Sequence, residues 1–221
     1  MKNAIISPSV LDADFLHFDS EIQRIKDAGL SWIHFDVMDG HFVKNISFGN
    51  LWLKRLNRKM EMEFVKDVHV MIEDPLSMVE KFRDAGANYL TFHYEACKSD
   101  KEVFEVIDRI HECGMKAGIS IKPGTPVTKV YPFLYSLDLV LLMSVEPGRG
   151  GQKFIDQSLN RIYALKSQIK EENLSVLVSV DGGINDVTGP NCLDMGADVL
   201  VVGQYLFGHE DFKERVERLL K

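Results

Sequence analysis

The sequence contains few cysteines and no long apolar run, and each shortage excludes a class of protein. Three cysteines, Cys97, Cys113 and Cys192, occur in 221 residues, and no two of them form a C-x-x-C pair. A disulfide framework or a zinc ribbon is therefore not expected, and a reducing cytoplasm is the expected location. The longest apolar run, LVLLMSV at 139–145, is too short to span a bilayer. The N-terminal segment has no apolar h-region, so we expect no signal peptide.

Positive charge is also scarce in this chain. There are 26 Lys and Arg residues against 33 Asp and Glu, which gives a formal net charge of -7. Duplex nucleic acid and anionic membranes bind basic surfaces, so we expect neither as a partner. A small anion remains compatible with the composition, because a few local donors can hold one phosphate group on an acidic protein.

Linkers and nucleotide-binding fingerprints are missing as well. No low-complexity stretch, Pro/Ser-rich linker or long charge block divides the sequence, which favours a single domain covering residues 1–221. No strand–G-x-G-x-x-G–helix pattern occurs, and we expect no nicotinamide cofactor.

Short β-rich runs recur along the whole chain. They are nearly continuous apolar stretches rather than strict alternations, which is typical of parallel strands covered on both faces. The expected strands lie at 4–8, 32–37, 65–71, 89–93, 116–121, 139–144, 176–180 and 199–202.

Amphipathic stretches separate these runs. Expected helices lie at 15–28, 75–84, 101–113, 157–170 and 212–220. Several end in a glycine that can take the left-handed cap and turn the chain into the next strand. Eight such strand–helix units close a barrel, whereas a doubly wound sheet normally uses five or six strands. The sequence therefore predicts an α/β protein with a TIM (β/α)8 barrel.

Histidine and carboxylate side chains occur near the expected carboxyl ends of three strands, where TIM barrels place their chemistry. His34 and Asp36 are two residues apart, so both side chains project from the same face. His69 lies near the end of the third strand, and Asp181 follows the seventh. A mixed nitrogen and oxygen site of this kind suits Zn²⁺, Fe²⁺, Mn²⁺ or Co²⁺ better than Ca²⁺ or Mg²⁺.

The fourth strand offers a competing pair. His93 and Glu95 have the same spacing as His34 and Asp36. Spacing alone therefore leaves open which of these side chains bind a metal.

Three glycine-rich segments follow strands late in the chain, at 146–152, 181–183 and 203–204. Glycine lets backbone N–H groups approach an anion closely, and a following helix N-terminus adds a favourable dipole. The last loops of a TIM barrel are a frequent phosphate site. The three segments together predict phosphate binding.

Eight segments in succession resemble signature segments of the ribulose-phosphate 3-epimerases. They run from about Ser7 to Phe207 and read SPSVLDADF, HFDVMDGHFV, DVHVM, AGANYLTFHYEA, KPGTPV, LLMSVEPGRGGQKF, VSVDGGIN and MGADVLVVG. The D-V-M-D-G-H-F-V and P-G-x-G-G-Q-K-F segments are the most specific of these.

The resemblance implies an isomerase of the pentose phosphate pathway that interconverts ribulose 5-phosphate and xylulose 5-phosphate. It implies one divalent metal ion held by His34, Asp36, His69 and Asp181. Asp36 and Asp181 would also be the catalytic acid/base pair, one removing the C3 proton and the other returning a proton to the opposite face. The metal would stabilise the cis-enediolate between these two steps.

The resemblance also implies substrate contacts. Met38, Met71 and Met143 would line the site, although filling of the barrel core explains these methionines almost as well. The implied substrate-binding residues are Ser9, His69, Gly148, Gly150, Gly151, Gly182, Gly183, Gly203 and Gln204.

Four residues depart from the usual pattern of the family. Lys44 replaces a proline, Lys122 an asparagine, Arg149 a phenylalanine and Gln204 a serine. These differences leave open whether Arg149 contacts the phosphate, and whether the substrate is a pentulose or a hexulose phosphate, as in the related allulose-6-phosphate 3-epimerases. A non-catalytic sugar-phosphate-binding protein is a further alternative. Epimerases of this type are usually homo-oligomers, and we expect the same here.

Overall fold

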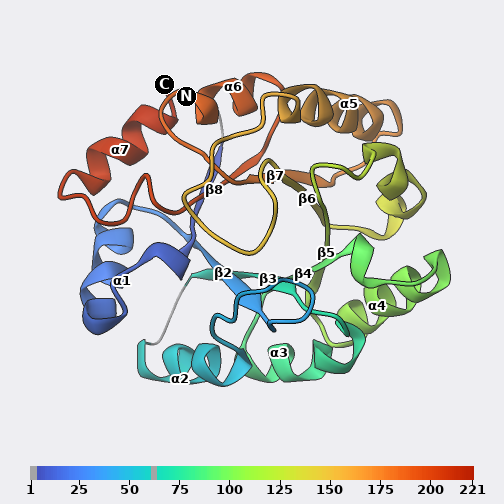
Figure 1. The fold of residues 1–221 in the computed structure, drawn as a ribbon, viewed down its shortest axis with the longest axis horizontal. Coiled ribbons are helices and arrows are strands. Elements are labelled where there is room, and N and C mark those ends of the chain that lie inside the picture. Colours follow the sequence, from blue (N-terminus) through green and yellow to red (C-terminus); the bar gives the residue numbers. More distant parts are fainter. Residues whose placement is uncertain (1–3, 61–63) are drawn as a thin grey trace.

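The computed structural model describes residues 4–60 and 64–221. In this part of the chain one parallel sheet contains eight strands, in the order β1-β8-β7-β6-β5-β4-β3-β2 (Figure 1). The strands are β1 (Ile5–Pro8), β2 (Trp32–Met38), β3 (Val65–Met71), β4 (Tyr89–His93), β5 (Lys116–Ile121), β6 (Leu139–Met143), β7 (Leu177–Asp181) and β8 (Val199–Val202).

The first and second strands bring the two ends of the sheet together. An isolated parallel bridge joins Ser9, directly after β1, to His34 in β2. The predicted TIM barrel is therefore confirmed, with its seam between β1 and β2. Two residues of the predicted site lie on that seam.

Helices surround the strands (Figure 1). The α-helices are α1 (Phe18–Asp27), α2 (Asn50–Met60), α3 (Val79–Ala85), α4 (Asp100–Glu112), α5 (Ser158–Glu171), α6 (Thr188–Asp194) and α7 (Phe212–Leu219). Short 3-10 helices are η1 (Val10–Asp12), η2 (Phe15–His17), η3 (Leu76–Met78), η4 (Tyr94–Ala96) and η5 (Val127–Ser136). No helix in the described ranges combines the length and the apolar composition that crossing a bilayer requires.

The predicted elements agree with the structure to within a few residues, with informative exceptions. The predicted helix at 15–28 begins as η2, capped by the Asp14 side chain, and becomes regular only in α1. β7 begins and ends one residue later than predicted, so Asp181 is its last residue. The predicted helix ranges leave out α2 and η5, and for α6 the sequence predicts the glycine end at Gly196 but gives no start. Helix α6 contains Gly189 and Pro190, two residues that oppose helix formation.

The barrel interior is filled by side chains. Successive residues of a strand point to opposite faces. In β6, Val140 and Leu142 belong to the core under the helices, whereas Leu141 and Met143 belong to a second cluster with Val201. That second cluster therefore fills the inside of the barrel and forms a floor below the polar residues at its mouth.

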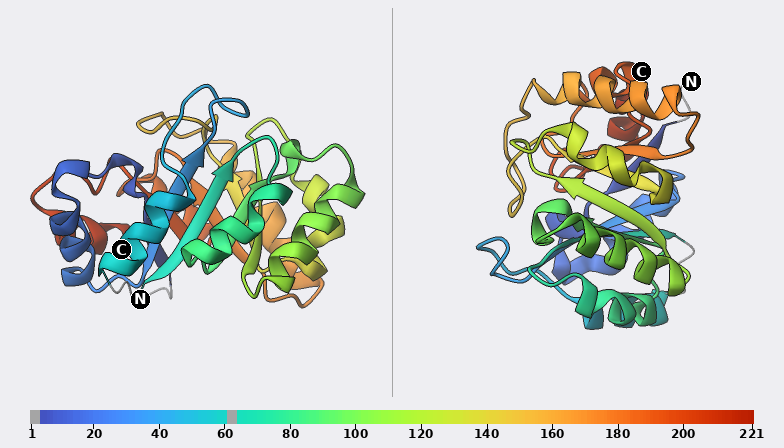
Figure 2. Two further views of the ribbon diagram at one scale, coloured as in Figure 1. Left: turned by 90° about the horizontal axis from the view of Figure 1, so that it is seen from below. Right: turned by 90° about the vertical axis from the view of Figure 1, so that its right-hand side faces the viewer.

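The loops at the carboxyl ends of the strands gather at one end of the barrel. In the side view of Figure 2, the blue loop after β2 and the gold loop after β6 rise at the end to which the strand arrows point. This is the end at which parallel barrels carry their chemistry.

Candidate functional site

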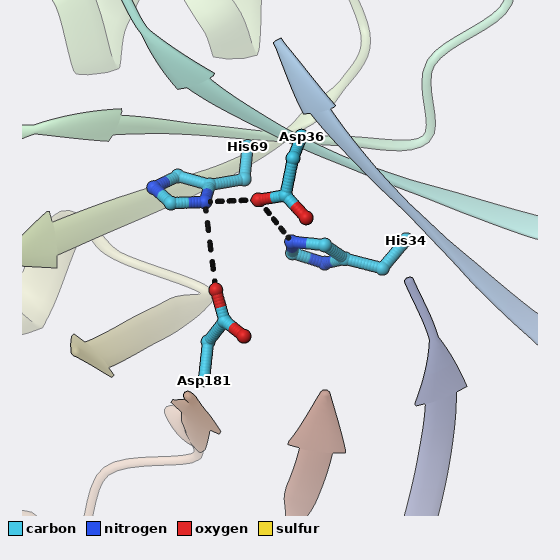
Figure 3. A group of neighbouring side chains, drawn as sticks. All are labelled: His34, Asp36, His69 and Asp181. Carbon is cyan, nitrogen blue, oxygen red and sulfur yellow. Dashed lines mark hydrogen bonds and ion pairs between the residues drawn. The ribbon is translucent and has the colours of Figure 1, made fainter. Parts of the chain in front are cut away.

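Four side chains from three strands meet at the barrel mouth. His34 and Asp36 come from β2, His69 from β3 and Asp181 from β7 (Figure 3). One ligand atom from each can be chosen so that all lie within 4.8 Å of one another. The structure thus brings together the four predicted metal ligands, close enough to share one ion.

The ring of His34 contacts the carboxylate of Asp67, a residue that the sequence analysis did not single out. Its Nδ1 lies 2.7 Å from Oδ2 of Asp67. Its Nε2 lies 3.3 Å from Oδ1 of Asp36, yet within the described part of the chain this buried atom has no hydrogen-bond partner. An imidazole nitrogen that is buried, unpartnered and aimed at carboxylates fits a bound cation.

His69 faces Asp36 through Nδ1, whereas His34 faces it through Nε2. The Nδ1 of His69 lies 2.9 Å from Oδ1 of Asp36 and 4.0 Å from Oδ2 of Asp181. Two nitrogens and two carboxylates therefore converge, a donor set that fits the divalent ions Zn²⁺, Fe²⁺, Mn²⁺ and Co²⁺.

The two aspartates have opposite electrostatic environments. Burial alone would raise the pKa of Asp36, but the nearby charge of His34 and the contacts that His34 and His69 make with its carboxylate bring that pKa well below its ordinary value. Burial and the nearby charge of Asp36 raise the pKa of Asp181 to about 8. Two carboxyl groups whose pKa values are driven apart are the usual arrangement for paired proton transfer.

Ser9 fixes the orientation of one of these carboxylates. Its hydroxyl donates a 2.6 Å hydrogen bond to Oδ2 of Asp36. This contact spans the seam of the barrel and leaves Oδ1 of Asp36 facing the two histidines.

A cavity of about 740 Å³ opens above the four side chains. Its lining includes nearly all of the predicted substrate contacts, namely Ser9, Met38, Met71, Met143, Gly148, Gly150, Gly151, Gly182, Gly183, Gly203 and Gln204, together with Asp36 and Asp181. Among the described residues, His34 and His69 are not part of this lining, because both are fully buried beneath it.

The glycine loops pack closely around one side of the cavity. Gly182 and Gly183 both have positive φ, at 118° and 64°. A Cβ atom on Gly183 would lie 2.6 Å from the backbone nitrogen of Phe154. Glycine is therefore required where the β7 loop meets the β6 loop, and the backbone is exposed to a ligand there.

We call the loops that carry Gly148, Gly150, Gly151, Gly182, Gly183 and Gly203 the glycine cradle. The sequence analysis missed one carboxylate that lies against it, Asp12. A Cβ atom on Gly150 would lie 2.8 Å from Oδ1 of Asp12, and one on Gly203 would lie 2.2 Å from Oδ2. The backbone N–H of Gln204 donates to Asp12, whose pKa is raised by burial and by the charge of Asp36. Asp12 follows Ser9 in one of the family-like segments, but no spacing rule connects it to loops so distant in sequence.

The four departures from the family pattern lie in different places. Arg149 and Gln204 line the cavity, whereas Lys44 is exposed on the β2 loop. The Lys122 ammonium lies 4.2 Å from the centre of the Phe42 ring. Only Arg149 and Gln204 are therefore placed to affect substrate binding directly.

Comparison with known proteins gives consistent results. Residues 5–207 match the model of the ribulose-phosphate 3 epimerase family. A ribulose-phosphate 3-epimerase of Treponema pallidum is 43% identical over 206 residues, covering 93% of this chain and 92% of that protein. The enzyme of the same name from Bacillus subtilis is 40% identical and covers 97% of each chain.

Solved structures of other proteins share the fold. A 3-hexulose-6-phosphate synthase from Salmonella typhimurium has a TM-score of 0.69 at 16% identity, covering 97% of this chain and 96% of that one. A tryptophan synthase alpha-subunit from Pyrococcus furiosus has a TM-score of 0.69 at 15% identity, covering 99% and 98%. These two likenesses concern the fold alone, whereas the family match and the full-length relatives make this chain a member of the ribulose-phosphate 3-epimerase family.

Proposed function

We propose that this protein is a ketose-phosphate 3-epimerase that interconverts D-ribulose 5-phosphate and D-xylulose 5-phosphate. The observation that carries the proposal is the pair Asp36 and Asp181. Both carboxyl groups belong to the proposed metal-ligand cluster at the mouth of one cavity, and their pKa values are driven in opposite directions.

Epimerisation at C3 needs one group to remove a proton and another to return one to the opposite face. Asp36 is the group that favours the ionised state and accepts the proton. Asp181 is the group that favours the protonated state and donates one. They come from β2 and β7, which are separated in the barrel by β8 and β1, so they approach a substrate from different sides.

The same two aspartates and the two histidines are the proposed ligands of one divalent ion. The ion, when bound, supplies positive charge that stabilises the negative charge developing on the substrate oxygens. The unpartnered Nε2 of His34 and the Nδ1 of His69 are the nitrogen donors. We propose Zn²⁺, Fe²⁺, Mn²⁺ or Co²⁺ as this ion.

The rest of the cavity holds the substrate and keeps water out. The methionines Met38, Met71 and Met143 are nearly fully buried and present thioethers that neither donate nor accept protons in the reaction. Ser9 holds Asp36 in place and contacts the sugar. The glycine cradle binds the phosphate through backbone N–H groups, with Asp12 displaced from Gln204 when the phosphate enters.

The pentulose phosphate is favoured over a hexulose phosphate because the full-length relatives described above carry the name ribulose-phosphate 3-epimerase. We further propose that the enzyme is a cytoplasmic homo-oligomer. The substrate assignment is tested by measuring kcat/KM on ribulose 5-phosphate and allulose 6-phosphate with metal-loaded protein. We expect the pentulose phosphate to be preferred, and a preference for the hexulose phosphate would overturn the assignment.

A further inference from the structure

A chain of hydrogen-bonded side chains leads away from the proposed metal ligand His69. The Nε2 of His69 lies 2.9 Å from Nε2 of His93, and the two rings are 5.0 Å apart between centroids. The Nδ1 of His93 lies 3.2 Å from Oε2 of Glu95. Both histidines are fully buried, and the proposed reaction gives neither His93 nor Glu95 a role.

These contacts determine which ring nitrogens of His93 and His69 carry hydrogen. A carboxylate only accepts hydrogen bonds, so Nδ1 of His93 must carry the hydrogen that it donates to Glu95. In a neutral imidazole the second nitrogen is then an acceptor, so Nε2 of His93 accepts from Nε2–H of His69. The Nδ1 of His69, which lies 2.9 Å from Oδ1 of Asp36, can then give up its hydrogen and bind a cation.

Glu95 is itself held in place from a different strand loop. Its Oε1 accepts a 2.8 Å hydrogen bond from the backbone N–H of Lys122 and a further hydrogen bond from the hydroxyl of Thr125. The far end of the chain is therefore anchored on the β5 loop, and the orientation of His93 follows from that anchor.

Resting on the proposed role of His69 as a metal ligand, we propose that His93 and Glu95 are positioning residues for the metal. They hold His69 in the state that carries hydrogen on Nε2 and offers Nδ1 to the ion. The other histidine ligand is oriented directly by a carboxylate, since Asp67 lies against His34. For His69 the carboxylate is that of Glu95, which acts through the imidazole of His93. The residues that support the site therefore extend to β4 and to the loop after β5.

Zinc affinity of the full chain tests the proposal, measured by competition with a chromophoric chelator. His93→Phe removes the acceptor while keeping a ring, and we expect the dissociation constant to rise about 10- to 100-fold. Glu95→Gln keeps the shape of the side chain and should give a smaller rise. His111→Gln is the matched control, because His111 pairs with Asp138 at 2.9 Å on the surface. Its zinc affinity should equal that of the wild type.

The nitrogen used by His69 provides a second readout that does not depend on any variant folding. In zinc-loaded, ¹⁵N-histidine-labelled wild-type protein, NMR should place the metal on Nδ1 of His69 and the hydrogen on Nε2. Coordination through Nε2, or an unchanged zinc affinity in folded His93→Phe, would overturn the proposal.

The positioning role and the epimerase activity can fail separately. Normal epimerisation by a His93→Phe variant of unchanged zinc affinity rejects only the positioning role. Lowered zinc affinity in that variant, together with a wild-type protein inactive on both sugar phosphates, rejects only the proposed reaction.

Discussion

His34 and Asp67 form a buried pair in which Nδ1 of the imidazole lies 2.7 Å from Oδ2 of the carboxylate. The Ser7 hydroxyl donates to the same oxygen at 3.4 Å. Asp67 therefore fixes the plane of the ring and turns Nε2 toward Asp36. This contact gives Asp67 a function that its position in the sequence does not reveal.

Replacing Asp67 with asparagine should weaken metal binding without removing any proposed ligand. Asparagine keeps the size of the side chain but loses the negative charge that makes the imidazole a better donor. We expect the zinc dissociation constant to rise about 10-fold or more, measured by chelator competition. An Asp67→Asn protein that binds zinc as tightly as the wild type would show that Asp67 has no such influence.

The two aspartates proposed to be catalytic should each be indispensable for turnover. Asp36→Asn and Asp181→Asn preserve shape but cannot exchange a proton, so we expect kcat to fall by about 10²- to 10⁴-fold in each variant. Asp186→Asn, which alters another carboxylate lining the cavity, should retain activity. Circular dichroism checks that all three variants are folded, and a folded Asp36→Asn or Asp181→Asn variant with wild-type kcat would contradict the assigned roles.

Asp12 should compete with phosphate for the glycine cradle, because its carboxylate accepts a hydrogen bond from the backbone N–H of Gln204. Asp12→Ser removes this charge, and we expect inorganic phosphate to bind roughly tenfold more tightly, equivalent to about 1.4 kcal/mol. Isothermal titration calorimetry measures the change, with Asp186→Ser as the control. Weaker phosphate binding in the Asp12→Ser variant would instead mean that Asp12 helps to hold the anion.

The stability of the metal-free protein should depend on pH through His93. Burial is the main cause that lowers the pKa of His93 from 6.5 to about 4. Because the unfolded chain binds a proton at higher pH than the folded one, the stabilising contribution is complete above pH 6.5 and is lost as the pH falls toward 4. The loss is on the order of 3 kcal/mol.

Urea unfolding in the presence of EDTA, at intervals across this pH window, measures the effect. His93→Gln removes the titrating group, so its unfolding free energy should fall less steeply with decreasing pH. Equal slopes for the two proteins would show that His93 is not held neutral by the fold.

The barrel could be predicted from local patterns, whereas the proposed ligand set followed from the resemblance to the family. Continuous apolar runs mark parallel strands, and His34, Asp36 and His69 stand near the ends of such runs. Spacing could not separate the His34–Asp36 pair from His93 and Glu95, since both pairs follow the same rule. Only the packing of β3 against β4 places the His93 ring against Nε2 of His69, away from the point where the four proposed ligands meet.

The parts that could not be predicted depend on contacts between distant segments. The closeness of Asp12 to Gly150 and Gly203 depends on the pairing of the first strand, β1, with the last, β8. The role of Asp67 depends on the orientation of a neighbouring ring rather than on any spacing. The start of helix α6 could not be predicted because Gly189 and Pro190 have low helix propensity, which tertiary packing overrides.

Incorporation of solvent deuterium at C3 tests the two-carboxylate reaction most directly. Metal-loaded protein is incubated with ribulose 5-phosphate in deuterated water, and the xylulose 5-phosphate formed is examined by NMR and mass spectrometry. One aspartate removes the original proton and the other supplies a proton exchanged with solvent, so the product should carry one deuterium at C3. Xylulose 5-phosphate that retains the original hydrogen at C3 would contradict this account.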